Sequence, residues 1–282
     1  MNPEEPGGGM MKDKRDVARE AILSAGSLLK ESFGREFEGM ITEKSRNDFV
    51  TETDRQSERM ITETLRRAFP HIGILAEESE EVLEKSSFWI IDPLDGTTNF
   101  IHGYPSVGIS IALIESGEVV LGYVYDPLRG ELFEAARGEG AYCNGKRIAV
   151  SGAQALDESL LGTGFPFRVH EHLDTYLNVF KDLFLRCRGI RRAGAAVLDL
   201  SHVAAGKLDG FWELYLKPWD MAAGALLVKE AGGVVSDFFG APGYLSTGNI
   251  VAATPAIHKN VVDTTSAFFR PQEIENLGSH FF

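Results

Sequence analysis

The chain has 282 residues and a hydrophobic content of 44%, which is enough to bury a large core. It carries 41 acidic residues against 28 basic ones, with a formal net charge of -13, and this balance argues against direct binding of nucleic acid, which needs a basic patch. Because no window reaches the roughly 18 consecutive apolar residues of a membrane-spanning helix, we also expect no membrane partner.

The first third of the chain predicts two helices followed by two strands. Residues 1–11 contain acids and glycines but no apolar core of a signal peptide, so we interpret them as a flexible tail. Residues 41–53 are polar and irregular. Asp54 is expected to cap the second helix. In chain order, the expected elements are helices over 12–33 and from Asp54 to Pro70, and strands over 72–76 and 87–91.

A run of strands is predicted for the middle of the chain. Ser116-Gly117 and Asn144-Gly145 are typical turns of β-hairpins. The strands around these turns are expected at 107–115, 118–126, 131–137, 140–143 and 147–150. Successive hairpins favour a mostly antiparallel sheet that helices cover on its apolar face.

After Ser151 the pattern changes to alternating strands and helices. The expected strands are 159–163, 189–192, 210–214, 234–237 and 250–252, and the expected helices are 172–185, 195–205 and 220–231. The last helix should end at Gly232-Gly233. We interpret the change of pattern as the boundary between an N-terminal lobe of residues 12–150 and a C-terminal α/β lobe of 151–265, followed by a tail over 266–282.

The most informative segment runs from Trp89 to Phe100. An apolar strand ends there in Asp92 and Asp95, and Gly96 and Thr97 follow at an expected helix start. Carboxylates ligate Mg²⁺ through oxygen, and the free N–H groups of a first helical turn face anions. Asp-Pro and Asp-Gly are also common turn dipeptides, so this segment alone leaves an ordinary strand-to-helix turn open.

Two further acids occupy similar positions. Glu77 follows an apolar run, and Asp220 stands just before a helix rich in Ala and Leu. Four acids at strand ends or helix starts would raise one another's pKa unless a cation accompanied them. The set is Glu77, Asp92, Asp95 and Asp220.

The segments 89–100 and 219–224, in this order, resemble the inositol monophosphatase family, and the resemblance extends over about residues 12–260. This family lies within a superfamily of lithium-sensitive, Mg²⁺-dependent phosphatases that includes fructose-1,6-bisphosphatase. With the element order, the resemblance implies an α/β fold (an α+β sandwich). Helices and sheets alternate in it as αβαβα layers, with a mostly antiparallel larger sheet and a smaller mixed sheet.

The resemblance implies two or three Mg²⁺ ions. Glu77, Asp92 and the Leu94 carbonyl match one metal site, and Asp92, Asp95 and Asp220 match the second, so that Asp92 bridges the two. The implied catalytic residues, which lie near the attacking water, are Glu77, Thr97 and Asp54. Lys44 matches a contact from a loop.

The implied substrate-binding residues fall into two groups. Gly96 and Thr97 match a phosphate-binding turn. Gly194, Ala195 and Ala196 match a backbone stretch that meets the substrate ring, and Glu213 matches an acid that accepts hydrogen bonds from ring hydroxyls. Many members have a hydroxyl residue at position 195, which is alanine here. Arg191 and Arg192 are interpreted as partners of acids, with the second phosphate of a bisphosphate substrate as the alternative.

The function implied by the resemblance is Mg²⁺-dependent hydrolysis of inositol monophosphates, small phosphate esters, by a homodimer. Cys143 and Cys187 are expected to be free thiols in a reducing cytoplasm. The alternatives on the same fold are a fructose-1,6-bisphosphatase and a histidinol-phosphate phosphatase. A further alternative is a protein-binding partner in bacterial transcription complexes. The acidic balance of the chain would favour a protein contact there over RNA.

Overall fold

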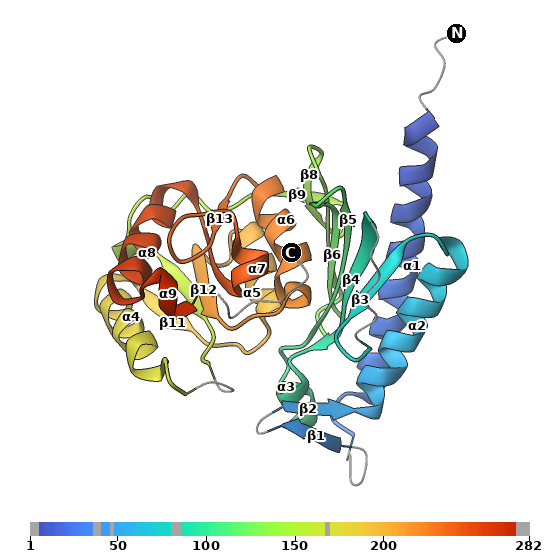
Figure 1. Ribbon diagram of the computed structural model, residues 1–282, viewed down its shortest axis with the longest axis horizontal. Coiled ribbons are helices and arrows are strands. Elements are labelled where there is room, and N and C mark those ends of the chain that lie inside the picture. Colours follow the sequence, from blue (N-terminus) through green and yellow to red (C-terminus); the bar gives the residue numbers. More distant parts are fainter. Residues whose placement is uncertain (1–5, 36–40, 46–47, 80–85, 167–169, 275–282) are drawn as a thin grey trace.

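The computed structural model describes residues 6–35, 41–45, 48–79, 86–166 and 170–274, with side chains described from residue 13 onward apart from 41–45 and 48–50 (Figure 1). Five layers of helices and sheets alternate. From right to left in Figure 1 these are α1 and α2, a seven-stranded sheet, α5 and α6, a five-stranded sheet, and α4 with α8. The predicted α/β class with αβαβα layers is confirmed. Among the described helices, none has the length and hydropathy needed to cross a bilayer.

The larger sheet is mostly antiparallel, as predicted. Its strand order follows the sequence from β3 to β9, and only the pair β3–β4 is parallel. The strands are β3 (Gly73–Ala76), β4 (Ser87–Asp95), β5 (Gly108–Glu115), β6 (Glu118–Asp126), β7 (Glu131–Ala136), β8 (Gly140–Cys143) and β9 (Lys146–Ile148). This order places β4, which carries the two aspartates, inside the sheet.

The smaller sheet is mixed and has the order β11-β10-β12-β14-β13. Strand β10 is parallel to β11 and β12, whereas β14 is antiparallel to β12 and β13. The strands are β10 (Leu160–Thr163), β11 (Gly189–Arg191), β12 (Gly210–Leu214), β13 (Val234–Ser236) and β14 (Asn249–Ala253).

Three apolar clusters hold the layers together. The first lies between the larger sheet and the pair α1 (Pro6–Ser32) and α2 (Glu52–Ala68), and the third lies between the smaller sheet and the pair α4 (Leu173–Arg186) and α8 (Pro255–Phe268). The second surrounds α5 (Ala196–Ala204) and α6 (Pro218–Glu230) between the two sheets. Because α6 is covered on both sides, its sequence is apolar all round rather than amphipathic.

Several elements were not predicted. They are the hairpin of β1 (Ile41–Ser45) and β2 (Asp48–Thr51), the helices α7 (Tyr244–Thr247), α8 and α9 (Pro271–Ile274), and the 3-10 turn Leu156–Glu158. Helix α3 (Thr97–Ile101) begins at the expected helix start. Helix α8 contains several β-branched residues, which weaken the helical signal of its sequence.

Some element boundaries differ from the predicted ones. Helix α1 begins at Pro6, within the expected tail of residues 1–11, and α8 and α9 occupy part of the expected tail of 266–282, where Ile274 is buried. The cap of α2 is Thr51, not Asp54, which is the third residue of the helix and bonds back to the cap. Helix α6 packs on both sheets, so the lobe boundary after residue 150 stays a proposal.

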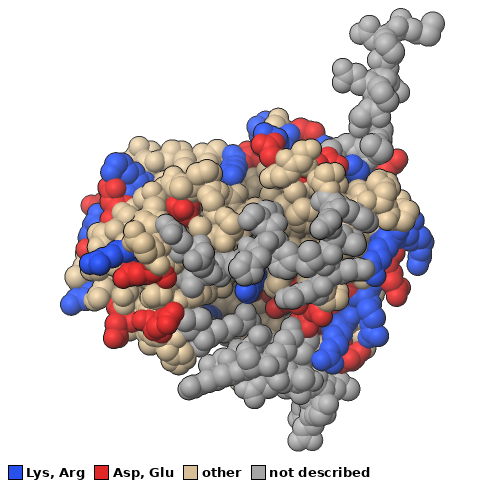
Figure 2. All heavy atoms as spheres, in the orientation of Figure 1, with Lys and Arg blue, Asp and Glu red and all other residues tan. Residues whose placement is uncertain are grey.

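Charge is unevenly distributed over the surface. Helix α2 exposes four arginines, a basic group that consists of Arg55, Arg59, Arg66 and Arg67. Basic side chains are visible at the right of Figure 2, on the side where α2 lies in Figure 1. Arg59 forms an ion pair of 2.7 Å with Glu52 on the same helix. A negative net charge therefore coexists with a local positive region.

Candidate active site

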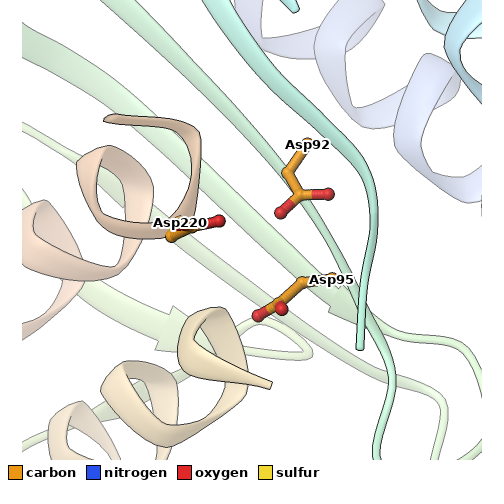
Figure 3. A group of neighbouring side chains, drawn as sticks. All are labelled: Asp92, Asp95 and Asp220. Carbon is orange, nitrogen blue, oxygen red and sulfur yellow. The ribbon is translucent and has the colours of Figure 1, made fainter. Parts of the chain in front are cut away.

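Three carboxylates converge where the larger sheet meets α6. Asp92 and Asp95 come from the end of β4, and Asp220 comes from the first turn of α6 (Figure 3). One carboxylate oxygen of each lies within 4.8 Å of the others. The structure therefore brings together three of the four acids that the sequence singled out as a group.

The end of β4 is irregular, and this lets two aspartates three residues apart share one site. In a regular strand, residues separated by three positions point to opposite faces. Here Asp92 pairs with Ser110 and Asp95 with Gly108, so three steps on β4 match two steps on β5. The irregularity lies between Asp92 and Asp95 and includes Pro93, which has no N–H to donate to the ladder.

Each of the three carboxylates accepts at least one backbone N–H. Leu94 N donates to Asp92 Oδ1 at 3.0 Å, Val197 N to Asp95 Oδ2 at 2.8 Å, and Lys217 N to Asp220 Oδ2 at 2.7 Å. Val197 belongs to the first turn of α5, whose own N-cap provides no side-chain hydrogen bond, so Asp95 satisfies that helix end from the neighbouring strand.

The remaining acceptor capacity and the electrostatics fit a divalent cation. Asp92 is 1% exposed, and its Oδ2 has no hydrogen-bond partner, which is costly for a buried oxygen. Burial, then Glu77, Asp95 and Asp220, raise the pKa of Asp92 well above its ordinary value. Burial, then Asp220, raise the pKa of Asp95 to about 7. An all-oxygen, acidic donor set of this kind is the type that Mg²⁺ prefers.

Glu77 and Leu94 lie in the wall of the same pocket. Glu77 follows β3, and its backbone N–H donates to the carbonyl of Ile91 at 3.3 Å. Its carboxylate does not belong to the group of atoms within 4.8 Å, although its charge acts on Asp92. The Leu94 carbonyl accepts a hydrogen bond of 3.2 Å from the Thr97 hydroxyl.

Asp54 is connected to Thr97 across the site. The Thr97 hydroxyl donates to Asp54 Oδ1 at 3.1 Å, while Asp54 Oδ2 accepts bonds from the backbone N–H and the hydroxyl of Thr51. Burial raises the pKa of Asp54 to about 6, and the bonds from Thr51 oppose this shift. Helix α2 therefore delivers a carboxyl group whose pKa lies near neutrality.

Gly96 caps the short helix α3 in a left-handed conformation. Its φ is 89°, and a Cβ at this position would lie 2.8 Å from the Ser106 carbonyl oxygen. Only glycine adopts this conformation in such a space without strain. Helix α3 has no side-chain cap, so the N–H groups of its first turn remain available at the pocket.

Asn99 is a site residue that the sequence analysis missed. Its Nδ2 donates to the carbonyl oxygens of Ser106 at 2.8 Å and Ala193 at 2.9 Å. This joins the turn after β4 to the stretch that contains Gly194, which has a φ of 86°. Its place in the motif Thr97-Thr98-Asn99-Phe100 was the available signal, but its partners are too far away in the sequence to be predicted.

The pocket has a volume of about 420 Å³, and its far wall contains Glu213, Gly194 and Ala196. Ala195, which the sequence placed at the substrate ring, is 0% exposed and is not among the lining residues, because it caps α5 inside the core. Lys44 lies in β1, where side chains are outside the description.

Two charged residues accompany Glu213. Burial raises the pKa of Glu213 well above its ordinary value, and Arg192 acts in the opposite direction. Of the two arginines Arg191 and Arg192, the second lines the pocket. Asp199, which the sequence analysis missed, is 2% exposed on α5. Its pKa is also raised, by burial and then by Asp95.

The layered fold and the clustered acids beside a helix start suit a phosphatase, and comparison with known proteins supports this class. The model of the inositol monophosphatase family matches residues 10–267. The chain therefore belongs to the inositol monophosphatase family, as the sequence motifs indicated.

Relatives and solved structures cover nearly the whole chain. Nus factor SuhB of Pseudomonas aeruginosa is 48% identical over 267 residues, which are 93% of this chain and 98% of the relative. The suppressor protein SuhB of Bartonella henselae is 40% identical with a TM-score of 0.87, over 90% of this chain and 99% of its own. An inositol monophosphatase of Thermotoga maritima is 38% identical with a TM-score of 0.83, over 91% and 98%.

Proposed function

We propose that the chain is a Mg²⁺-dependent phosphomonoesterase that hydrolyses inositol monophosphates to myo-inositol and phosphate. The observation that carries this proposal is the convergence of Asp92, Asp95 and Asp220 in a pocket that also contains Glu213. Membership of the inositol monophosphatase family supports a phosphatase. To this class the proposal adds the identity of the substrate and of the metal.

Two or three Mg²⁺ ions would be held by Glu77, Asp92 and the Leu94 carbonyl on one side, and by Asp92, Asp95 and Asp220 on the other. When bound, they would neutralise the phosphate oxygens and lower the pKa of a water molecule. The unpartnered Oδ2 of Asp92 supports its place between the two sets.

The residues on the α2 side handle the attacking water. The single hydrogen of the Thr97 hydroxyl is directed at Asp54 Oδ1 and the Leu94 carbonyl, so its lone pairs are free to accept a hydrogen bond from the water. With a pKa of about 6, Asp54 can accept a proton from the water through Thr97 near neutral pH. Glu77 orients the same water. The oxygen of this water forms a bond to phosphorus in line with the ester bond that breaks, and the leaving ester oxygen takes up a proton.

The residues on the opposite wall hold the leaving group. Glu213 accepts hydrogen bonds from ring hydroxyls, and the backbone around Gly194 and Ala196 lies against the ring. The proposal also includes inhibition by Li⁺, a homodimer and a cytoplasmic location, and these three rest on the family resemblance.

A panel of phosphate esters tests the proposal. We expect the purified chain with Mg²⁺ to hydrolyse inositol 1-phosphate with a higher kcat/KM than fructose 1,6-bisphosphate, histidinol phosphate or p-nitrophenyl phosphate, and excess chelator to abolish all hydrolysis. Preference for the bisphosphate or for histidinol phosphate would establish one of the alternatives. Absence of hydrolysis for every ester would contradict an enzymatic role.

A second candidate function is a protein partner in bacterial transcription complexes. It is favoured by the relatives that bear the name Nus factor SuhB. That name, with the basic group on α2, also counts against the expectation that the chain stays away from nucleic acid. Purified transcription complexes can be tested for binding of the wild-type chain and of an inactive variant. Equal binding by both would separate this role from catalysis.

A further inference from the structure

Gly164 lies beside Glu213 at the C-terminal ends of β10 and β12, two interior strands of the smaller sheet. In the parallel pair β10–β12, Gly162 pairs with Phe211 and Thr163 with Trp212, so the next position of this register sets Gly164 against Glu213. Neighbouring residues in a parallel register point their side chains to the same face. A side chain at position 164 would therefore share the face that carries the Glu213 carboxylate.

The Glu213 carboxylate occupies the space that such a side chain would fill. A Cβ on Gly164 would lie 1.8 Å from Oε1 and 2.0 Å from Cδ of Glu213. Gly164 is not among the residues with positive φ, so its backbone conformation does not require glycine. The requirement is for space, because the carboxylate leans across the Cα atom of the neighbouring strand.

The two strands cannot separate easily at this point. The Trp212 carbonyl oxygen lies 3.0 Å from the Thr163 hydroxyl and 3.1 Å from the Tyr176 hydroxyl, so it accepts a hydrogen bond from this pair. The two hydroxyl groups are also 2.7 Å apart, and Thr163 and Tyr176 are 0% exposed. An added methyl group at position 164 would therefore displace the flexible Glu213 side chain rather than the strands.

We propose that Gly164 is a positioning residue that sets substrate choice through Glu213, because the missing side chain allows the carboxylate to reach the substrate hydroxyls. This inference rests on the proposed function, in which Glu213 binds the ring of a polyol phosphate. Gly164 itself touches neither the metal site nor the phosphate.

The test compares the wild type with Gly164→Ala, Glu213→Ala and the double variant on two esters, inositol 1-phosphate and p-nitrophenyl phosphate. Gly162→Ala is the matched control, because it lies on the same strand and face. Its Cβ would meet Leu208 at 2.9 Å, Phe211 at 3.3 Å and Asp199 Oδ1 at 3.6 Å, and Glu213 is not among these three nearest neighbours. Thermal unfolding is recorded for every variant.

We expect Gly164→Ala and Glu213→Ala each to lower kcat/KM for inositol 1-phosphate about tenfold or more relative to p-nitrophenyl phosphate, the size of one charge-assisted hydrogen bond. The double variant should lose no more than Glu213→Ala alone, since both changes remove the same contact. Gly162→Ala should lose stability but keep the wild-type ratio of the two esters.

The outcomes separate this inference from the function on which it rests. Selective loss in Glu213→Ala without selective loss in Gly164→Ala, or losses that multiply in the double variant, would overturn the inference alone. Equal losses on both esters in Glu213→Ala would overturn the ring-binding role of Glu213 and the inference with it. If Gly164→Ala does not fold, folding of the double variant supports the clash with Glu213, and its failure to fold overturns the inference.

Discussion

Asp95 shows at the scale of one residue how the site combines structural and chemical roles. One of its oxygens accepts the N–H of Val197, and one of its oxygens lies in the group shared with Asp92 and Asp220. Burial and the neighbouring Asp220 raise its pKa to about 7. A neutral side chain of the same shape should therefore satisfy the helix end but fail as a ligand.

We predict that Asp95→Asn lowers kcat with Mg²⁺ by about a hundredfold or more, because changes to residues that only support metal ligands already cost about 10–100-fold. The asparagine Oδ1 can still accept the bond from Val197, so the fold should remain. Measurements of kcat and of the melting temperature in excess chelator check both parts.

Of these two measurements, the melting temperature in chelator better distinguishes a metal ligand from a structural residue. Without a cation, Asp95→Asn removes one charge from a buried acidic cluster, so the variant should melt no lower than the wild type. Near-normal turnover would remove Asp95 from the metal ligands, and a marked loss of stability in chelator would make its role structural.

Among single residues, the acids were predictable and their supports were not. Glu77, Asp92, Asp95 and Asp220 stand at the ends of strongly apolar segments, a pattern visible in the sequence itself. Asn99, Asp199 and Gly164 act through residues that the fold brings near, and no local pattern shows those contacts.

At the scale of secondary structure, the short helix α3 and its cap shape the wall of the pocket where we propose that the phosphate binds. Gly96 and Gly117 both have positive φ, of 89° and 81°, but differ in their surroundings. A Cβ on Gly96 would approach the Ser106 carbonyl, whereas a Cβ on Gly117 would meet nothing within 4 Å. Comparing alanine substitutions at these two positions therefore distinguishes the cost of backbone strain from the cost of a steric clash.

We predict that Gly117→Ala lowers the free energy of unfolding by about 1 kcal/mol, the cost of a left-handed conformation for alanine. Gly96→Ala should cost about 1–3 kcal/mol more, since backbone atoms must move to admit the methyl group. Gly96→Ala alone should also impair hydrolysis. Urea unfolding compares the free energies of unfolding, and kcat/KM compares the activities. Equal losses of unfolding free energy in both variants would show that the Ser106 backbone moves aside at no measurable cost.

The success of element prediction varied with the local pattern. The strands β5 and β6 form a hairpin around a two-residue turn that the sequence shows clearly. Their predicted limits differ from the observed ones by one residue at most. The hairpin of β1 and β2 was missed because its residues are polar and lack a turn dipeptide of that type. Helix α2 begins earlier than predicted because the Asp54 carboxylate, at the third position of the helix, accepts a hydrogen bond from the N–H of its cap, Thr51.

At the scale of the whole molecule, the site joins parts that are far apart in the sequence. Asp92 and Asp95 come from the larger sheet, whereas Asp220 comes from a helix between the two sheets. The unfolded chain holds no such group, so a cation that binds it must stabilise the folded state. We therefore expect excess Mg²⁺ to raise the melting temperature relative to excess chelator.

Because these pKa values are raised, the stability of the folded state depends on pH. The carboxyl group of Asp95 has a pKa of about 7 in the fold and about 3.9 in an unfolded chain. Between these values the folded state binds more protons than the unfolded state, so the contribution of Asp95 to stability falls as pH rises, and above about 7 it stays low. The pKa of Asp92 is raised in the same direction.

Protons and Mg²⁺ compete for these oxygens, so the Mg²⁺-induced rise in melting temperature should be larger at about pH 8 than at about pH 5. Melting curves at both pH values, with Mg²⁺ or with chelator and K⁺ at matched ionic strength, measure it. In Asp95→Asn the rise should be smaller and depend less on pH, because one of the competing groups no longer titrates. A rise of equal size at both pH values in the wild type would mean that the acids are already ionised without the metal. The pKa values of these acids would then not be raised, and protons would not compete with Mg²⁺ at this cluster in that pH range.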